Sequence, residues 1–594
     1  MSYSKEMAEA HAFGAMFRPT NQDRALAEAI AGGTLHLHPH KPWKLPGEPT
    51  WREDPFKETN WTFQYQTLRW LDPLRRRAAA GDSHFIDTWL KYATSWIERN
   101  PPGRGVSRYS WADMVDGARA LTFSFALPVI EEHRPDALPL ILASLEEHGA
   151  WLEDPAHIKT GNHALQQHQG LLVLGAVLQR PDWVELARER CVEMVHIAYD
   201  DEGINEEGAL QYHHMNYSWW NLMRRRFEIT MGSSPQDFDR VNRAPIGMAH
   251  ATRPDGRVEM IGDTEEFKMG GVDHPAVRYV HSSGREGVPP RERVKVYSRG
   301  YAFGRSTWGD ARESFADASF YSLRFGSQKQ IHGHNDGMAL TLFANGESFL
   351  RDAGKFTYDV ADPVRKYVVS RAGHNSVSLD GIEYERATEV VLDAHSIDES
   401  AEFYRLVDRG YPGVTITRRV LVSLHQRLAV VVDDIESARA VRARQWWHFA
   451  EGASHRREEG SVFVRSGSNR ARLFRLDGSD SLSVYEGSTS PLQGWYSPNW
   501  REKVPVRTLA FEPGPGQSRM LTLLCFDGTA ERAEAELVDV DSSWIAATVS
   551  LPDGRSTSLL LGEQWGTVTP GRASVEDFGS LIAERNASSQ VGEQ

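Results

Sequence analysis

The stretch HGHNDGMALTLFANGESFLRDAGKFTYD, residues 332–359, indicates how the second half of the chain folds. Two short runs of β-strand type, Met338–Ala344 and Glu347–Arg351, stand on either side of the dipeptide Asn345-Gly346. Asn-Gly between two such runs is a strong β-hairpin signal. The stretch therefore predicts two antiparallel strands whose open end brings Asp352 back toward the residues that precede Met338.

Short runs of this kind continue from about residue 300 to the end of the chain. Turn dipeptides separate them, including Asp380-Gly381, Asp527-Gly528 and Asp553-Gly554. Many short strands joined by such turns are typical of a large antiparallel β-sandwich. The other predicted strands are Phe320–Phe325, Ser376–Leu379, Val414–Val422, Arg427–Asp433, Ser461–Val464, Met520–Cys525, Ile545–Leu551 and Ser556–Leu561.

The first half of the chain has helical periodicity instead. Ser110 and Asp113 resemble a capping box for a helix through Leu121 and Phe125. Short breaks join the predicted helices, a pattern typical of stacked αα-hairpins. A Gly/Pro/Ser-rich stretch at 282–290 then precedes the strands, so we predict an α+β multidomain protein with a helical domain at 1–290 and a sheet domain at 291–594. The other predicted helices are Phe85–Ile97, Leu138–Leu152, His163–Leu178, Trp183–Ala198 and Tyr217–Ile229.

Composition and charge exclude several classes of protein. The 594 residues are 40% hydrophobic and 25% charged, as in an ordinary globular protein, and the two cysteines exclude a disulfide scaffold. With 67 basic and 81 acidic residues the net charge is −14, which disfavours nucleic acid as a partner. No run is long and apolar enough for a membrane helix, and no leader is visible, so we expect a cytoplasmic protein without a membrane partner. Nothing in the sequence indicates an oligomeric state.

The segment Gly161-Asn162-His163 begins a predicted helix. Free N–H groups and the positive end of the helix dipole make such a position suitable for an anion, and the two side chains add donors. The alternative is that Asn162 only caps the helix.

A second polar and aromatic segment runs from Glu207 to Tyr217 and precedes Trp219-Trp220. Tyr212 and Tyr217 are candidates for proton transfer, in particular if cations or a metal lower the pKa of a tyrosine there. The tandem tryptophans suit stacking on a sugar, or else they belong to the core.

Two further segments supply ligands for a metal. If His332-Gly333-His334-Asn335-Asp336 is extended, His332, His334 and Asp336 share one face. The hairpin returns to Asp352, and His374 precedes another strand. Two imidazoles and a carboxylate on adjacent strands form a plausible metal site with open positions, composed of His334, Asp352 and His374.

Four stretches together resemble the heparinase II/III-like polysaccharide lyases. They are residues 332–359, RKYVVSRAGHNSVSLDG (365–381), TGNHALQQH (160–168) and EEGALQYHHMNY (206–217). The resemblance implies an N-terminal (α/α) toroid followed by an antiparallel β-sandwich. It also implies cleavage of uronic-acid-containing polysaccharides or oligosaccharides, glycosaminoglycans or alginate, by β-elimination.

The resemblance also implies roles for individual residues. Asn162 and His163 would bind the uronate carboxylate, His332 would line the site as a base, and Tyr212 or alternatively Tyr217 would be the tyrosine of the toroid. A divalent metal, zinc or alternatively manganese, would be held by His334, Asp352 and His374. A second tyrosine would be Tyr358 or Tyr367, and Trp219 and Gln166 are further candidates for contact with the acidic saccharide. Gln166 stands where heparinase-type members carry a glutamate, which is a departure from the family pattern.

These roles fit the chemistry of a lyase. Removal of the C5 proton of a uronate develops charge on the carboxylate, which hydrogen-bond donors stabilise, and an acid must protonate the leaving oxygen. Two alternatives stay open: a glycoside hydrolase that uses a carboxylate pair such as Glu206 and Asp263, and a non-catalytic carbohydrate-binding protein. Only a lyase leaves an unsaturated uronate that absorbs ultraviolet light.

Overall fold

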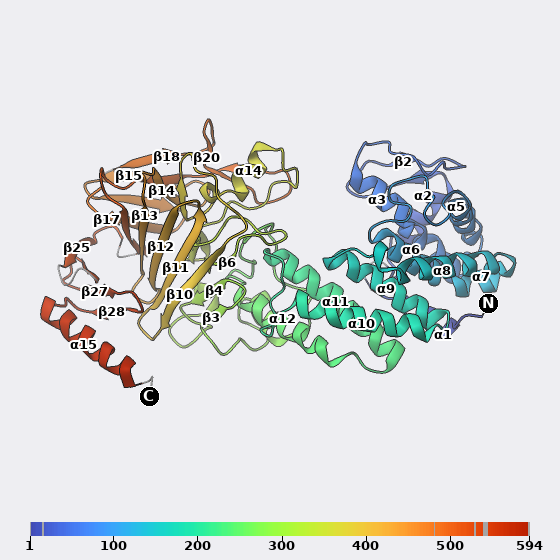
Figure 1. Cartoon of the computed structure of the whole chain (residues 1–594), viewed down its shortest axis with the longest axis horizontal. Helices are drawn as coiled ribbons and strands as arrows, with labels where there is room; N and C mark the ends of the chain where they lie inside the picture. The colour runs from blue at the N-terminus through green and yellow to red at the C-terminus, as the bar shows by residue number, and fades with distance from the viewer. Residues whose placement is uncertain (1, 15–16, 480, 528–529, 539–543, 592–594) are drawn as a thin grey trace. The chain divides into compact units, whose positions relative to one another are not determined.

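The computed structural model describes residues 2–14, 17–479, 481–527, 530–538 and 544–591, and the chain divides into two compact units. One unit comprises Met1–Tyr199 and Asn216–Asn242, and the other comprises Asp200–Met215 and Arg243–Gln594. The first is mainly helical, and the second carries the large sheets (Figure 1). This division follows contacts, whereas the predicted boundary near residue 290 follows the change from helices to strands.

Several helices of the first unit are amphipathic. In α5 (Phe85–Arg99), for example, Trp89, Ala93 and Trp96 recur at helical spacing and are fully buried. Its helices are α1 (Lys5–Ala10), α2 (Asp23–Ala31), α3 (Thr59–Thr67), α4 (Asp72–Ala79), α5 (Phe85–Arg99), α6 (Val115–Ser124), α7 (Leu127–His133), α8 (Leu138–Glu153), α9 (Gly161–Val177) and α10 (Pro181–Ala198), with the short 3₁₀ helix η1 (Arg69–Leu71). Helix α11 (Leu210–Met231) begins in the second unit and continues into the first.

Two glycines let α6 and α9 cross in backbone contact. A Cβ atom on Gly170 would lie 2.7 Å from the Cα of Gly117, and one on Gly117 would lie 2.6 Å from the carbonyl oxygen of Gln166. No larger residue fits this crossing without a shift of the helices. The crossing holds the start of α9, which carries Asn162 and His163, close to the start of α6.

The predicted helices are present, but two details are wrong. The capping box is absent, because α6 begins at Val115 with Met114 as N-cap and no side-chain cap. Asp113 instead has a left-handed backbone (φ 66°). The helix predicted from Tyr217 begins at Leu210, so the polar segment before Tyr217 forms the first turns of α11.

The second unit contains antiparallel sheets, as the runs of short strands predict, and helices α13 (Pro275–His281), α14 (Pro363–Val369) and α15 (Val575–Val591). Helix α12 (Asp239–His250) begins in the first unit and continues into the second. One sheet has the order β3 (Val294–Tyr297), β4 (Tyr301–Arg305), β5 (Phe320–Arg324), β7 (Leu340–Ala344), β8 (Glu347–Leu350). The largest has the order β15 (Ser454–Glu458), β16 (Ser461–Ser466), β17 (Asn469–Arg475), β24 (Arg519–Phe526), β13 (Leu428–Ser437), β12 (Val414–Ser423), β11 (Glu402–Tyr411), β10 (Glu389–Ile397), β6 (Gly326–Ser327). Two others are β18 (Leu482–Tyr485), β23 (Thr508–Phe511), β14 (Ala443–His448), β9 (Val377–Leu379), and β25 (Glu534–Val538), β26 (Ile545–Ser550), β27 (Ser556–Leu561), β28 (Gly566–Pro570).

The central strands of the largest sheet are buried on both faces. Along β12, Val420 and Val422 belong to one core cluster and Leu421 belongs to another, as the alternation of side chains across a strand requires. The first cluster joins the largest sheet to the sheets that contain β7 and β14, and the second joins it to β26 and β27. The unit is therefore layered, with the largest sheet inside (Figure 1).

The Asn345-Gly346 hairpin is confirmed. Asn345 (φ 50°) and Gly346 (φ 77°) both have left-handed backbones, as a type I′ turn requires, and Phe343 pairs with Ser348 in the β7–β8 ladder. The Asp553-Gly554 turn likewise joins β26 to β27, whereas Asp380-Gly381 joins strands of different sheets and Gly528 lies outside the described residues. The sequence did not predict β10, in which mostly polar side chains face solvent. Among the described helices, none has the length and apolar character to cross a membrane.

Candidate active site

A single carboxylate, that of Asp263, binds both histidines of the HxH segment. His332 Nδ1 lies 3.1 Å from Asp263 Oδ2, and His334 Nε2 lies 2.9 Å from Asp263 Oδ1. The guanidinium of Arg365, on α14, forms an ion pair with the same carboxylate. The expectation of an extended segment is wrong, because His332 has a left-handed backbone (φ 58°). Its side chain stays partly exposed, whereas His334 and Asp336 are buried.

The environment of Asp263 keeps it ionised. Burial alone would raise the pKa of this carboxyl group, but hydrogen bonds from His332 and His334 and the pairing with Arg365 outweigh burial and lower the pKa well below its usual value. A carboxylate that accepts from Nδ1 of His332 fixes the proton on that nitrogen. Nε2 of His332 is then left with a lone pair, the state that a general base needs.

Tyr212 stacks directly on His332. The two ring centroids are 3.5 Å apart and the planes differ by 10°. The Tyr212 hydroxyl lies 2.8 Å from the hydroxyl of Tyr358, whose ring meets the His332 ring edge-on at 5.6 Å. Three of the predicted residues are therefore brought together within the second unit: Tyr212, His332 and Tyr358.

Both tyrosines are held in the protonated state. Burial raises the pKa of Tyr212, and the negative charges of Asp263, Glu207 and Glu265 add to this effect. Burial, the hydrogen bond with Tyr212 and the negative charges of Asp263 and Glu265 raise the pKa of Tyr358 as well. The direction is opposite to the lowered pKa considered from the sequence, so these hydroxyls are proton donors at neutral pH.

Lys355 is the buried cation of this cluster. Its Nζ lies 3.0 Å from a carboxylate oxygen of Glu265 and 3.4 Å from the hydroxyl of Tyr358. A cation at this position stabilises negative charge on the tyrosine pair during proton transfer. Glu207 lies 3.9 Å from Nε2 of His332, where it attracts the imidazolium that forms when His332 takes a proton.

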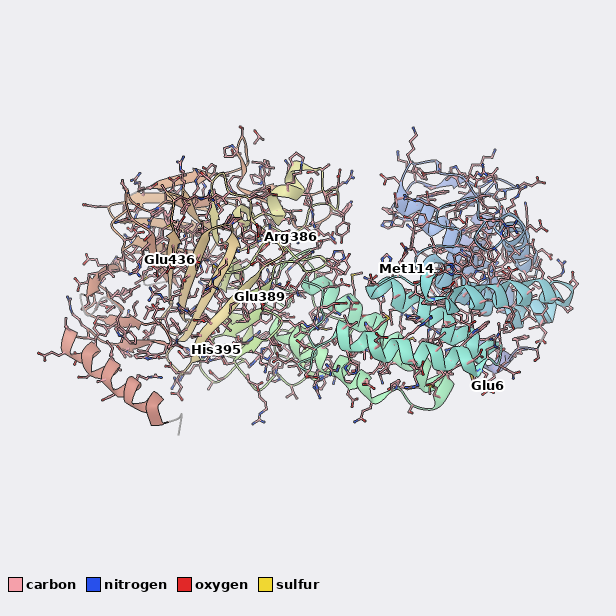
Figure 2. The ribbon with its side chains drawn as sticks, in the orientation of Figure 1. Glu6, Met114, Arg386, Glu389, His395 and Glu436 are labelled. Carbon is pink, nitrogen blue, oxygen red and sulfur yellow. The ribbon has the colours of Figure 1, made fainter. Side chains whose placement is uncertain are left out.

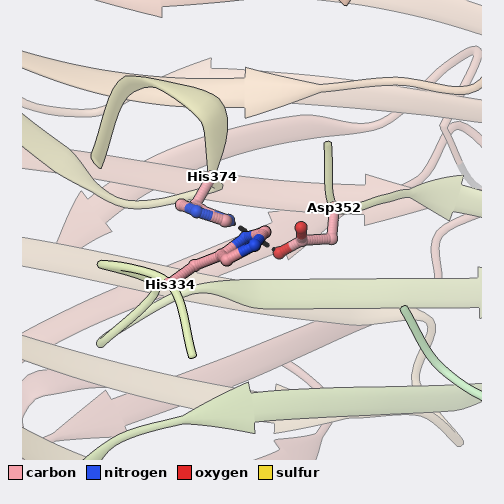
Figure 3. A group of neighbouring side chains, drawn as sticks. All are labelled: His334, Asp352 and His374. Atoms are coloured by element: carbon pink, nitrogen blue, oxygen red, sulfur yellow. Dashed lines mark hydrogen bonds and ion pairs between the residues drawn. The ribbon is translucent and has the colours of Figure 1, made fainter. Parts of the chain in front are cut away.

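His334, Asp352 and His374 form a compact buried group (Figure 3). One ligand atom of each lies within 4.8 Å of the other two. The hairpin places Asp352 at the end of β8, and the segment before β9 supplies His374, as the sequence predicted. Asp352 Oδ2 accepts a hydrogen bond from Nδ1 of His374 at 2.7 Å.

This group can hold a metal ion. Nδ1 of His334 and Nε2 of His374 are buried nitrogen atoms without a hydrogen-bond partner among the described residues. Such atoms are costly unless a ligand satisfies them. Nε2 of His334 meanwhile contacts Asp263, which is the arrangement in which a carboxylate orients a ligating imidazole. Two imidazole nitrogens and one carboxylate suit a divalent ion such as zinc.

Asn162 and His163 occupy the first turn of α9 in the helical unit. Thr160 is the N-cap of this helix and Asn162 is its second residue, so the cap alternative is wrong. His163 Nδ1 bonds to the carboxylate of Asp113, the residue with the left-handed backbone before α6. That carboxylate orients the His163 ring.

The remaining candidates differ in position. Gln166 and Trp219 line a cavity together with Asn162. Tyr217 is half-buried on α11. It lies five residues after Tyr212, so the two side chains project from the helix about 140° apart. Tyr367 is buried in a small core cluster, and its hydroxyl donates to Oε1 of Gln493 at 2.7 Å.

The carboxylate pair of the hydrolase alternative has unsuitable surroundings. Asp263 is fully buried, and Arg365 and the two histidines occupy its oxygens, so it has no access to a glycosidic oxygen. Burial raises the pKa of Glu206, as a general acid requires. A hydrolase also needs a second, accessible carboxylate, and Asp263 does not provide one.

Sequence reasoning missed several polar residues of these clusters. Their partners cannot be read from local spacing, because His163 lies 50 residues from Asp113 and Asp263 lies 102 residues from Arg365. The residues are Asp113, Lys355 and Arg365, together with the role of Asp263.

Known proteins resemble this chain over most of its length. Residues 19–265 match the family described as heparinase II/III N-terminus, and residues 314–535 match the heparinase II/III-like C-terminal family. A heparin-sulfate lyase from Bacteroides thetaiotaomicron is 21% identical over 438 residues, which cover 66% of this chain and 61% of that protein. The match thus spans about three fifths of the length of the curated relative.

Solved structures share the fold. A heparan sulfate lyase (HepC) mutant from Pedobacter heparinus superposes with a TM-score of 0.75 at 16% identity, over 94% of this chain and 92% of the other. A heparinase III structure gives 0.74 at 16% identity, over 92% and 91%. At this identity the likeness concerns the fold.

Proposed function

The chain belongs to the heparinase II/III-like family, and from this premise we propose that it is a polysaccharide lyase that cleaves an acidic glycosaminoglycan by β-elimination. We further propose that its helices form the (α/α) toroid and its sheets the β-sandwich of such lyases. The substrate proposal is a glycosaminoglycan of the heparin or heparan sulfate type, because the similar proteins bear those names.

One observation supports the activity more than any other, the stack of Tyr212 on His332 above Asp263. In this arrangement Nε2 of His332 takes the C5 proton of the uronate. Asp263 holds the ring by Nδ1 and stabilises the imidazolium that results. The hydroxyl of Tyr212, protonated at neutral pH, supplies a proton to the leaving glycosidic oxygen, and Tyr358 and Lys355 lie behind it to support the transfer.

The uronate carboxylate needs donors of its own. Removal of the C5 proton spreads negative charge onto the carboxylate oxygens, and each donor that binds more strongly as charge develops lowers the barrier. We assign this role to Asn162 and His163, which stand at the N-terminal end of α9, where the helix dipole also favours an anion. Asp113 positions His163 for the contact.

His334, Asp352 and His374 would hold a divalent metal, and zinc suits their donor atoms best. When bound, the metal would tie the end of the β7–β8 hairpin to the segment before β9. Since Asp263 contacts both His334 and His332, this tie also fixes the position of the base.

The test of the proposal is a screen for ultraviolet-absorbing product. Wild-type protein is incubated with heparin, heparan sulfate, chondroitin sulfate, hyaluronan and alginate, and the absorbance of the unsaturated uronate is followed. We expect product from heparin or heparan sulfate, and alginate tests whether the enzyme has a broader range. Release of reducing ends without ultraviolet absorbance would identify a hydrolase instead.

Variants then test the assigned residues. Tyr212→Phe and His332→Ala should each reduce turnover by about 100-fold or more, as expected for loss of a general acid or base. Tyr367→Phe is the matched control, because its hydroxyl also donates a buried hydrogen bond but lies in another cluster. Full activity in both Tyr212→Phe and His332→Ala would contradict the mechanism.

A further inference from the structure

The helical unit contains a cavity of about 330 Å³ lined by parts of α6, α9, α11 and η1. Met114, which is labelled in Figure 2, contributes to its wall at the start of α6. Apolar side chains such as Phe17 and Trp219 form most of the lining. Two arginines line it as well, Arg69 and Arg226, and these are the unusual feature.

Arg69 has no counter-charge in the part of the chain that the structure describes. Among the described residues no carboxylate, carbonyl oxygen or ring contacts its guanidinium group, and its Nε is a buried atom without a hydrogen-bond partner. Burial alone lowers the pKa of Arg69 to about 10. Arg119, a fully buried arginine of this unit, shows the contrast: its three nitrogens donate to His148, Gln66 and Ser110.

Arg226 adds a second cation to the same cavity. It is 1% exposed, and its nitrogens donate to Oε1 of Gln169 at 3.2 Å and to the carbonyl oxygen of His11 at 2.8 Å. No carboxylate of the described residues pairs with it, and burial lowers the pKa of Arg226 to about 9. Nε2 of Gln169 is a further buried donor without a partner. The cavity therefore offers several donors and two positive charges, and its own lining contains no acidic side chain.

Uncompensated buried charge destabilises a folded protein, so its presence requires a reason. An anionic ligand supplies the missing charge, and a guanidinium group matches the oxygen geometry of a sulfate or a carboxylate. We propose that this cavity is a binding subsite for an anionic substituent, sulfate or carboxylate, of a saccharide, and that Arg69 is its principal contact. The ring face of the sugar would pack on the apolar lining. The saccharide part of this inference rests on the proposed function, whereas the anion does not.

The test measures binding without turnover. In a Tyr212→Phe background, calorimetry gives the Kd of a sulfated heparin tetrasaccharide, an unsulfated uronate-containing tetrasaccharide and a neutral tetrasaccharide. Arg69→Gln should weaken binding of the sulfated probe by about 10- to 100-fold, the loss expected for a charged hydrogen bond, and leave the neutral probe unchanged. Weakening of the sulfated probe alone identifies a bound sulfate, and equal weakening of both acidic probes identifies a carboxylate.

Two further variants complete the experiment. Arg52→Gln removes an exposed arginine and should leave every Kd unchanged. Arg69→Lys keeps the charge but loses the planar fork, so its affinity should fall between those of the parent and Arg69→Gln. The Tm of Arg69→Gln should equal or exceed that of the parent protein, because an unpaired charge is removed.

Unchanged affinity of Arg69→Gln for both acidic probes would overturn the proposal, and so would a lowered Tm without a loss of affinity, since that result indicates a structural arginine. These outcomes are independent of the ultraviolet assay. If the wild-type protein yields no unsaturated product, but Arg69→Gln weakens the binding of acidic saccharides, the lyase function is contradicted and the subsite is still supported.

Discussion

Asp263 has two carboxylate oxygens, and each accepts from a different histidine. His332 contacts one oxygen and His334 contacts the other, while the ion pair with Arg365 balances the negative charge of Asp263. The HxH pattern was visible in the sequence, but its partner is about 70 positions upstream and belongs to no motif. Sequence reasoning could therefore propose the histidines, but it could not supply the residue that orients them.

The lowered pKa of Asp263 predicts a pH-dependent contribution to stability. Because the folded pKa lies below the unfolded value of about 3.9, the contribution is complete above that pH and is lost as the pH falls toward the folded pKa. Asp263→Asn should lower the free energy of unfolding by about 3–5 kcal/mol at pH 7, the usual effect of breaking a buried ion pair. The deficit should shrink below pH 4.

Urea unfolding at pH 7, 5 and 3.5 measures this deficit. Asp136→Asn serves as control, since Asp136 pairs with Arg134 in an exposed ion pair and its loss should hardly affect stability. A deficit for Asp263→Asn that is the same at all three pH values would contradict the prediction.

Asn162 allows stability and catalysis to be separated. Since Thr160 and not Asn162 is the N-cap of α9, Asn162→Ala should change stability by less than the ~1 kcal/mol typical of cap loss. Loss of a donor to developing charge costs about 100- to 1,000-fold in kcat. Circular dichroism melting and steady-state kinetics on one preparation measure both quantities.

The control for this variant is Asn242→Ala, which removes an exposed asparagine near the C-terminal end of the helical unit. Near-normal kcat in Asn162→Ala, equal to that of the control, would leave Asn162 without a catalytic role.

Among the elements, the β7–β8 hairpin was predicted most completely from sequence. The Asn-Gly signal acts locally, because the turn requires two left-handed residues and few dipeptides permit them. The neighbouring HxH segment was not predicted correctly, since its left-handed residue at His332 depends on contacts with Asp263 and not on neighbouring residues. The start of α11 was missed for a similar reason: Gln211, His213 and His214 interrupt the apolar period, and each finds a distant partner.

Gly346 tests the hairpin as an element. A Cβ at this position meets nothing within 4 Å, so only the left-handed backbone (φ 77°) opposes a side chain. Gly346→Ala should therefore lower the free energy of unfolding by about 1–2 kcal/mol. Denaturant titration of the purified variant measures this loss.

Gly579 is the matched control, because a Cβ there also meets nothing within 4 Å but the residue lies inside α15. Gly579→Ala should stabilise the protein by up to ~1 kcal/mol. Equal effects of the two substitutions would show that the backbone conformation at Gly346 is not restrictive.

At the scale of the whole molecule, the sequence revealed the change from helices to strands but not the division into compact units. The chain enters the sheet-rich unit at Asp200, leaves it after Met215 and returns at Arg243. Such a path depends on contacts between distant segments, and the local hydrophobic periodicity of the sequence does not predict such contacts. Because the segment Asp200–Met215 belongs to the second unit, Tyr212 lies in the same unit as His332.

The proposed metal site lies wholly in this second unit, so loss of the metal should destabilise only this unit. His334→Ala should release the metal and lower the Tm of the sheet-rich unit, since the remaining ligands are left buried and unsatisfied. Elemental analysis, and calorimetry scans that resolve the transitions of the two units, measure these effects. We expect the transition of the helical unit to stay in place.

His395→Ala is the control, because His395, labelled in Figure 2, lies exposed on β10. Full metal content in His334→Ala would remove this residue from the site. A shift of both transitions would mean that the two units do not unfold independently.

The shared carboxylate also has a consequence for inheritance. Glutamate at position 263 would displace both oxygens by one methylene, and asparagine would offer an oxygen to one histidine and an amide to the other. No single replacement keeps both contacts, so positions 263, 332 and 334 should be retained or lost together among descendants of a common ancestor. A relative that has lost the metal-side histidine should therefore show a changed residue at position 263 as well.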